Sequence, residues 1–347
     1  MEFKNANELL ALCRQEGCPI SEIMRRRECA LGETTVETVT RRMTRVLEIM
    51  RQSATIPLTS PIRSMGGLIG GEAKHLAAHA AQKKDICGPV LQKAVTYAMA
   101  VLEVNASMGL IVAAPTAGSS GVVPGLLLAL QETYHISDER IMDGLFNAGA
   151  IGYLAMRNAT VAGAVGGCQA EVGIAAAMAA SAAVELMGGE PEQCLSAAST
   201  VLMNMLGLVC DPVGGLVEYP CQNRNAAGVA NALVAAEIAL SGIQQLIPFD
   251  EMLAAMGDRG CLVMEEGQIT QVPTLPLEGP VADTTGAGDA FIAGLMYGLY
   301  HDAPLTRCVA LGNIMGGVCV QHVGCLTGRI TAGELEAKAQ RILDNME

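Results

Sequence analysis

The sequence predicts a mainly α-helical fold that ends in a shorter α/β segment. From about residue 93 to residue 240, apolar runs rich in alanine alternate with glycine-rich breaks. Alanine has the best intrinsic helix propensity and a small side chain, so these runs predict closely packed helices. No alternation of apolar and polar residues typical of strands occurs before about residue 257. We therefore place a boundary there and expect two domains, 1–256 and 257–347.

The composition limits the classes of function. The 347 residues are 51% hydrophobic but only 3% aromatic, so the core must consist mainly of small and aliphatic side chains. A formal net charge of −13 argues against nucleic-acid binding, which requires a cationic surface. The polar opening Met1–Asn5 predicts no signal peptide. With 12 cysteines in a chain of this length, we expect a reducing, cytoplasmic location and metal chemistry.

The first third of the chain predicts helices separated by polar breaks. Residues 7–53 alternate in this way, and the run Arg25–Arg27 predicts a solvated helix face. Residues 64–84 begin with a glycine-rich segment, Ser64–His75, which predicts a loop that leads into a basic helix start.

The middle of the chain predicts buried helices. The stretch Val104–Gln131 carries no charge and is long enough to span a bilayer, but its centre holds a polar loop. We therefore expect two buried segments around that loop and no membrane span. The run Val172–Met187 predicts a core helix.

The last ninety residues have a different pattern. Cys261–Met264 and Gln268–Val272 flank a Glu-Glu-Gly turn, which predicts a β-hairpin. After a proline-containing connection, the run Asp283–Phe291 contains a glycine turn that predicts the start of a helix.

Three cysteines stand among glycine, proline and polar residues rather than in apolar helical runs. They are Cys168, Cys210 and Cys221. Their wide separations and the lack of a Cys-x-x-Cys pair argue against structural zinc and against a ferredoxin-type cluster. Three thiolates could instead hold an iron–sulfur cluster with one iron open to a substrate, and three packed or incidental thiols are the alternative.

The run Pro115–Gly121 is rich in hydroxyl groups and glycine. At a helix N-terminus, such a turn can bind a small carboxylate through backbone N–H groups and hydroxyls. An ordinary capped helix start is the alternative interpretation.

Three motifs together resemble a known family. The run Thr116–Pro124, the run Gly167–Gly173 and the long run Cys210–Ala226 are similar, in the same order, to the α subunit or domain of iron–sulfur-dependent L-serine dehydratases. The resemblance covers roughly residues 1–256. It implies a helical α-domain fold and the elimination of water from L-serine, which gives pyruvate and ammonia without pyridoxal phosphate.

The same resemblance implies a site. It makes Cys168, Cys210 and Cys221 the ligands of a [4Fe-4S] cluster whose open iron acts as a Lewis acid on the substrate hydroxyl. It implies that Thr116, Gly118, Ser119 and Ser120 surround the substrate carboxylate. Ser119 and Ser120 are also expected to be catalytic. Lys74 is the expected base, with His75 as the alternative.

Further expectations follow from this resemblance. Arg224 and Asn225 would orient the cluster ligands, and Asn225 would also contact the substrate. We expect L-serine as the substrate, and a separate β subunit or self-association as partners.

The C-terminal segment resembles a second family. The run Asp283–Asp289 is similar to the signature of ribokinase-like (PfkB) sugar kinases. In that family the glycine turn, here Gly286, Ala287 and Gly288, forms an anion hole, and the residue matching Asp289 activates an acceptor hydroxyl. The portion that binds the sugar in that family has no counterpart here. A sugar or nucleoside kinase, or an inactive chimera, is therefore the alternative to the dehydratase.

Overall fold

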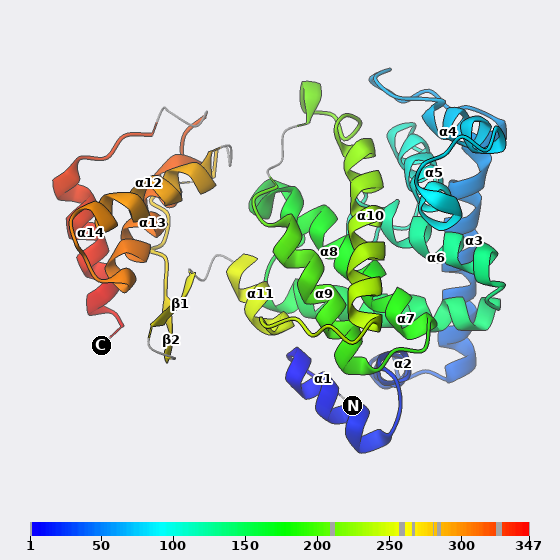
Figure 1. The fold of residues 1–347 in the computed structure, drawn as a ribbon, viewed down its shortest axis with the longest axis horizontal. Helices are drawn as coiled ribbons and strands as arrows, with labels where there is room; N and C mark the ends of the chain where they lie inside the picture. The colour runs from blue at the N-terminus through cyan, green and yellow to red at the C-terminus, as the bar shows by residue number, and fades with distance from the viewer. Residues whose placement is uncertain are drawn as a thin grey trace.

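A computed structural model gives the arrangement of the chain (Figure 1). The structure describes residues 2–208, 212–256, 261–265, 268–279, 281–282, 286–323 and 328–346. Within them the elements are α1 (Ala6–Glu16), α2 (Ile20–Leu31), α3 (Val36–Thr59), α4 (Glu72–Ala81), α5 (Gly88–Ala106), α6 (Val122–Tyr134), α7 (Asp138–Asn158), α8 (Gly163–Leu186), α9 (Pro191–Met205), η1 (Val213–Gly215), α10 (Cys221–Leu240), α11 (Phe249–Met256), β1 (Cys261–Glu265), β2 (Gln268–Val272), α12 (Ala287–Tyr300), α13 (Leu305–Val320) and α14 (Ala332–Asp344). The predicted helical class is confirmed.

The helical part of the chain packs around α8, which contacts α7, α9 and α10 (Figure 1). The alanines of α8 between residues 175 and 183 are almost completely buried. Their small side chains let neighbouring helices approach closely, as the alanine-rich pattern predicts. On α10 the contact falls at Gly228, where an added methyl group would lie 3.0 Å from the Val172 side chain.

Of the two uncharged stretches, Val172–Met187 is confirmed as a core helix and Val104–Gln131 is confirmed only in its second half. Residues 122–130 are buried in α6, as predicted. The first half is not a buried segment, because α5 ends at Ala106 and Met108 and Leu110 lie exposed in the connection that follows. Among the described residues, one segment, Gly166–Leu186, is apolar and long enough to cross a membrane, but it is mostly buried inside the protein. Burial of this kind is typical of the central helix of a protein core.

One prediction about the arginines of α2 is wrong. The run Arg25–Arg27 does not form a solvated face, because the Arg27 residue is only 6% exposed. Its guanidinium lies 3.7 Å from the centre of the Tyr153 ring. Arg25 binds the carboxylates of Glu22 and Asp143, which neutralises its charge at the α2–α7 contact. The Tyr153 ring for Arg27, and the Glu22 and Asp143 carboxylates for Arg25, therefore allow these two cations to be buried or half-buried.

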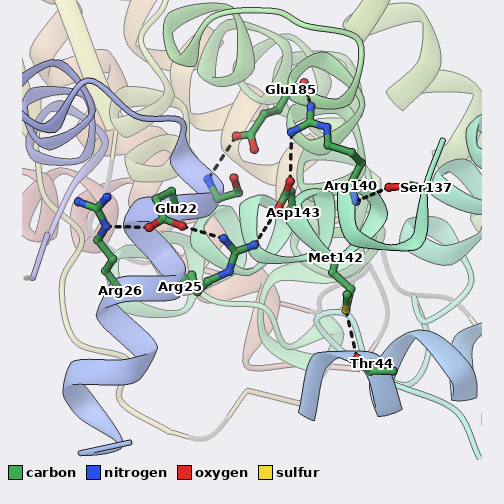
Figure 2. Close-up of polar contacts among 10 residues, drawn as sticks. Glu22, Arg25, Arg26, Thr44, Ser137, Arg140, Met142, Asp143 and Glu185 are labelled. Carbon is green, nitrogen blue, oxygen red and sulfur yellow. Dashed lines mark hydrogen bonds and ion pairs between the residues drawn. The ribbon is translucent and has the colours of Figure 1, made fainter. Parts of the chain in front are cut away.

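Figure 2 shows how this network fixes α2 and α8 against α7. The buried carboxylate of Glu185 accepts hydrogen bonds from the Ser21 N–H at 3.2 Å and from the Asn147 amide at 2.7 Å. Burial raises the pKa of Glu185 above its ordinary value, and these donors oppose that rise only in part. Arg140 of α7 adds a hydrogen bond to the Glu185 carbonyl oxygen at 3.3 Å.

The C-terminal residues form a second hydrophobic core. The predicted hairpin is confirmed, because β1 and β2 pair antiparallel with Cys261 opposite Val272. Val263 and Val272 pack with apolar residues of α13 and α14 in a cluster that is separate from the core around α8. In the described part of this segment, a hairpin and three helices are present.

Candidate active site

The hydroxyl-rich loop before α6 forms one wall of the candidate site. As predicted, residues 115–121 lead directly into a helix, and Ser119 and Ser120 are fully buried. Three successive N–H groups, those of Ala117, Gly118 and Ser119, have no acceptor among the described residues. The Ser120 Oγ atom is likewise without a partner there. A buried unpaired hydroxyl is costly, and successive N–H groups without an acceptor can bind an anion, so this loop is a candidate place for one.

Asn225 of α10 fixes the shape of this loop. Its amide nitrogen donates to the Gly118 carbonyl at 2.8 Å, and its amide oxygen accepts from the Gly121 N–H at 3.0 Å. The same nitrogen donates to the carbonyl of Cys221 at 2.9 Å. The side chain predicted to orient cluster ligands therefore ties the loop to the start of α10.

Cys168 lies at a break in α8. Gly167 has φ +73° and ψ −179°, a conformation outside the helix that side-chain-bearing residues avoid. The Cys168 thiol group is almost fully buried, and its Sγ atom accepts a hydrogen bond from the Arg224 guanidinium at 3.1 Å. A cation next to the sulfur favours the thiolate, which is the form that binds metals.

Cys221 is the first residue of α10 and is also buried. The positive end of the helix dipole favours a thiolate at this position. Arg224 follows one turn later on the same helix and reaches Cys168. The start of α10, where Cys221 lies, is therefore linked to Cys168 through the Arg224 side chain.

The third predicted ligand, Cys210, lies outside the described residues. Both described flanks of that gap are anchored at the same place. Leu208 accepts a hydrogen bond from the Gln169 N–H at 2.9 Å, next to Cys168. On the other side, the Val213 N–H donates to the Tyr219 carbonyl at 2.8 Å, two residues before Cys221.

The described donor set fits an iron–sulfur cluster. Cysteine sulfur is a soft ligand that suits iron–sulfur clusters, and a hydrogen bond to the sulfur, as from Arg224, is a common feature around such ligands. No group of three or more His, Cys, Asp or Glu side chains forms a metal site in the part of the chain that the structure describes, which leaves Cys210 out of the search. Cys168 and Cys221 are the two described members of the three cysteines that the sequence predicts as ligands.

The glycine loop of residues 64–71 is held from the other side by Glu218. This 2% exposed residue accepts hydrogen bonds from the Ser64 hydroxyl and the Gly66 N–H, both at 2.6 Å, and from the Leu68 N–H at 3.0 Å. Loss of hydration would raise the pKa of Glu218, but these three donors outweigh it, and the pKa lies below its ordinary value. The loop is therefore fastened to the segment that carries Cys221.

Lys74 and His75 lie exposed in the first turn of α4, directly after this loop. The N–H of Ala73 donates to the buried Glu103 at 2.9 Å. Gln222, beside Cys221, donates to the Met99 carbonyl of α5 at 3.3 Å. The start of α4 is thus connected to α10 through α5, although the structure shows no contact between Lys74 and the other predicted site residues it describes.

The serine dehydratase alpha chain profile matches residues 15–273. The chain belongs to that family. It is 45% identical over 263 residues to the L-serine dehydratase alpha chain of Peptoniphilus asaccharolyticus, which covers 76% of this chain and 90% of that one. It is 46% identical over 254 residues to the probable L-serine dehydratase alpha chain of Bacillus subtilis, covering 73% and 84%.

Longer members of the family also match. The chain is 33% identical over 265 residues to the L-serine dehydratase TdcG of Escherichia coli. That match covers 75% of this chain but 58% of the longer protein. The family resemblance seen in the cysteine and hydroxyl motifs is therefore confirmed, for short alpha chains and for longer proteins.

The second resemblance is confirmed as well. A profile of pfkB family carbohydrate kinases matches residues 225–332 and so overlaps the dehydratase match from residue 225 to 273. Gly286, with φ +80°, stands before α12, which begins at Ala287. Asp289 is exposed in the first turn of this helix. Residues 283–285 of the predicted motif lie outside the described part.

The sequence reasoning gave no role to Glu171, although it belongs to one of the dehydratase motifs. Its carboxylate accepts a hydrogen bond from the Thr116 hydroxyl. Glu171 follows Cys168 by three residues on α8, and residues three apart share a helix face. That spacing is the signal that could have placed this carboxylate at the site.

Proposed function

We propose that this chain is the cluster-binding α chain of an L-serine dehydratase. It eliminates water from L-serine to give aminoacrylate, which hydrolyses to pyruvate and ammonia. The observation that carries the proposal is the hydrogen bond from Arg224 to Cys168, because it links the start of α10, which carries Cys221, to the cysteine motif of α8. The names of the related alpha chains support the reaction.

The cofactor of the proposed enzyme is a [4Fe-4S] cluster held by Cys168, Cys210 and Cys221. When bound, the cluster supplies a Lewis-acidic iron that stabilises the negative charge on the departing hydroxyl oxygen. The buried position of Cys168 and Cys221 keeps water from the sulfur atoms.

The loop before α6 binds the substrate carboxylate. A hydroxyl has one proton to donate, and the Thr116 proton goes to Glu171. In the Thr116–Ser119 contact of 3.1 Å, Ser119 is therefore the donor. The groups left for the carboxylate are the Ser120 hydroxyl and the backbone N–H groups at Gly118 and its neighbours.

Lys74 removes the Cα proton in the proposed reaction, and Asn225 holds the carboxylate loop in place through its two hydrogen bonds. The glycine loop fixed by Glu218 sets the position of α4, which carries Lys74. The variants Lys74→Met and His75→Gln separate the two candidate bases. Loss of the base lowers kcat while L-serine still binds, so the variant with this effect identifies the base.

A β chain binds this protein near the same site, in the cytoplasm. Several apolar side chains around the glycine loop are exposed, including Met65, Met108 and Leu110 at 75%, 80% and 63%. The N–H of Met65 donates to the Ala106 carbonyl at 2.9 Å, which places the loop beside the segment that carries the other two. Exposed apolar patches often mark protein interfaces.

The central test is reconstitution of the protein under anaerobic conditions with iron and sulfide. The expected result is a cluster absorbance, bound iron and sulfide, and release of pyruvate from L-serine. Cys168→Ala, Cys210→Ala and Cys221→Ala lose bound iron, whereas the control Cys87→Ala, at an exposed position, keeps it. Folded protein that binds no cluster and releases no pyruvate contradicts the proposal.

A further inference from the structure

We infer that Glu171 binds the α-ammonium group of the substrate and thereby selects amino acids over acids that lack this group. The inference rests on the proposed function. L-Serine carries a carboxylate and an ammonium on the same carbon atom, so a site that holds the first must meet the second at short range. A positive group moved out of water requires a negative or strongly accepting partner.

The position of Glu171 meets this requirement. Its carboxylate accepts the Thr116 hydroxyl of the loop proposed to bind the substrate carboxylate. It also lies against the backbone of that loop, since a methyl group added at Gly118 would come within 2.7 Å of the Oε1 atom. On the opposite side a methyl group at Gly163 would come equally close, 2.7 Å, to the Oε2 atom. Two glycines thus make room for this carboxylate and fix its position.

The other carboxylates near the site face other segments. Glu218 accepts three hydrogen bonds from the glycine loop. Glu103 accepts the Ala73 N–H at the start of α4 with its Oε1 atom, while its buried Oε2 atom has no partner among the described residues. Glu171 forms no ion pair with a Lys, Arg or His side chain in the described ranges, and it accepts a hydrogen bond from a neutral hydroxyl of the loop proposed to bind the substrate carboxylate. Its contact with that loop, which the structure does not show for Glu103 or Glu218, places Glu171 within reach of the ammonium group.

The hydroxyl groups around Glu171 are also arranged for a negative charge. Ser119 donates to Thr116, and Thr116 donates to Glu171, so the two dipoles point the same way toward the carboxylate. The Glu171 carboxylate next to the loop proposed to bind the substrate carboxylate gives an amino acid one partner for each of its charges.

The test compares two ligands that differ in the ammonium group. L-Alanine and propionate are measured as inhibitors of L-serine turnover, and as ligands by calorimetry, with the reconstituted enzyme. Glu171→Gln is expected to weaken L-alanine binding and raise the KM for L-serine by about 10- to 100-fold, the size of one charged hydrogen bond. Propionate binding stays unchanged. The control variant Glu48→Gln, on the exposed face of α3, changes the binding of neither ligand.

The outcomes separate the inference from the proposed function. If the wild-type protein turns over L-serine but Glu171→Gln keeps its KM, or weakens both ligands equally, the inference is wrong and the function stands. If the wild-type protein binds and converts no L-serine, the function itself fails. Should Glu171→Gln not assemble with its cluster, Glu171→Asp keeps the charge at a shorter reach. Glu171→Asp must then weaken the binding of L-alanine and leave the binding of propionate unchanged. Equal weakening of binding for both ligands overturns the inference.

Discussion

The hydroxyl of Ser64 donates a 2.6 Å hydrogen bond to the carboxylate of Glu218 across 154 residues of sequence. The contact joins the glycine loop before α4 to the loop that ends at Cys221. Gly66 belongs to the same contact, because a methyl group there would lie 2.3 Å from the Leu216 side chain and 2.8 Å from the Glu218 carboxylate. The cysteine loop and the glycine loop therefore adopt their conformations together.

We predict that Glu218→Ala loosens the glycine loop without unfolding the helical core. The variant removes the acceptor of the Gly66 and Leu68 N–H groups, each bonded to a charged oxygen. Hydrogen bonds of this type contribute about 1.5–3 kcal/mol, so hydrogen exchange at these two amides should speed up by about tenfold or more. Exchange in α8 should not change, and equal acceleration there would show general destabilisation instead.

Acid should have a similar effect on the wild-type loop. The pKa of Glu218 is lowered in the folded protein, so its stabilising contribution is present above the ordinary carboxyl pKa and is lost as the pH falls through the lowered value. Exchange at Gly66 and Leu68 should accelerate in that acidic window in the wild type but not in Glu218→Ala. Protection that does not depend on pH would contradict this account.

Removal of the Arg224 guanidinium should weaken the proposed cluster. Arg224→Met leaves the Cys168 sulfur without its 3.1 Å hydrogen bond. Groups that contact a metal ligand typically contribute about 10- to 100-fold to metal affinity, so the variant should lose iron to a chelator correspondingly faster. The matched control is Arg157→Met, because Arg157 is exposed at the end of α7. Equal iron loss from both variants would remove the assigned role of Arg224.

Local patterns predicted much of the fold but little of what joins its parts. Helices, the hairpin and the turn before α6 follow from residue periodicity and turn chemistry, which act over a few residues. The neutralisation of Arg25 by Asp143 depends on a partner 118 residues away, and no local pattern records it. For that reason Arg25 and Arg27 were predicted to be solvated and are not.

The candidate site, too, was predictable from local patterns only in part. The residue types around Cys168 and Cys221 marked them as unusual, because glycine and proline break helices at both positions. Their meeting through Arg224 could not be predicted, since it depends on how α10 packs against α8. Glu171 lay in a recognised motif, yet its partner Thr116 is 55 residues distant and only the folded chain brings the two together.

The buried carboxylate of Glu185 should make the helical core less stable as the pH rises. Burial raises its pKa in the folded state, so the folded chain binds more protons than the unfolded chain between the ordinary and the raised value. The free energy of unfolding must then decrease as the pH increases through that window. Glu185→Gln lacks this ionisation and should show a flatter profile in urea unfolding measured at several pH values. Parallel profiles for the two proteins would exclude Glu185 as the cause.

Replacement of Asp289 by Asn should leave the dehydratase reaction unchanged. Asp289 is exposed at the start of α12, in the segment whose apolar core is separate from the one that contains Cys168. A change at Asp289 therefore has no continuous buried path to the candidate site, and L-serine turnover should stay within about twofold of wild type. The matching assay supplies ATP and a panel of sugars and nucleosides. Phosphorylation by the wild type that disappears in Asp289→Asn would establish a kinase in this segment. No phosphorylation by either protein is the expected result, because the kinase match covers residues 225–332 and its first part is shared with the dehydratase match.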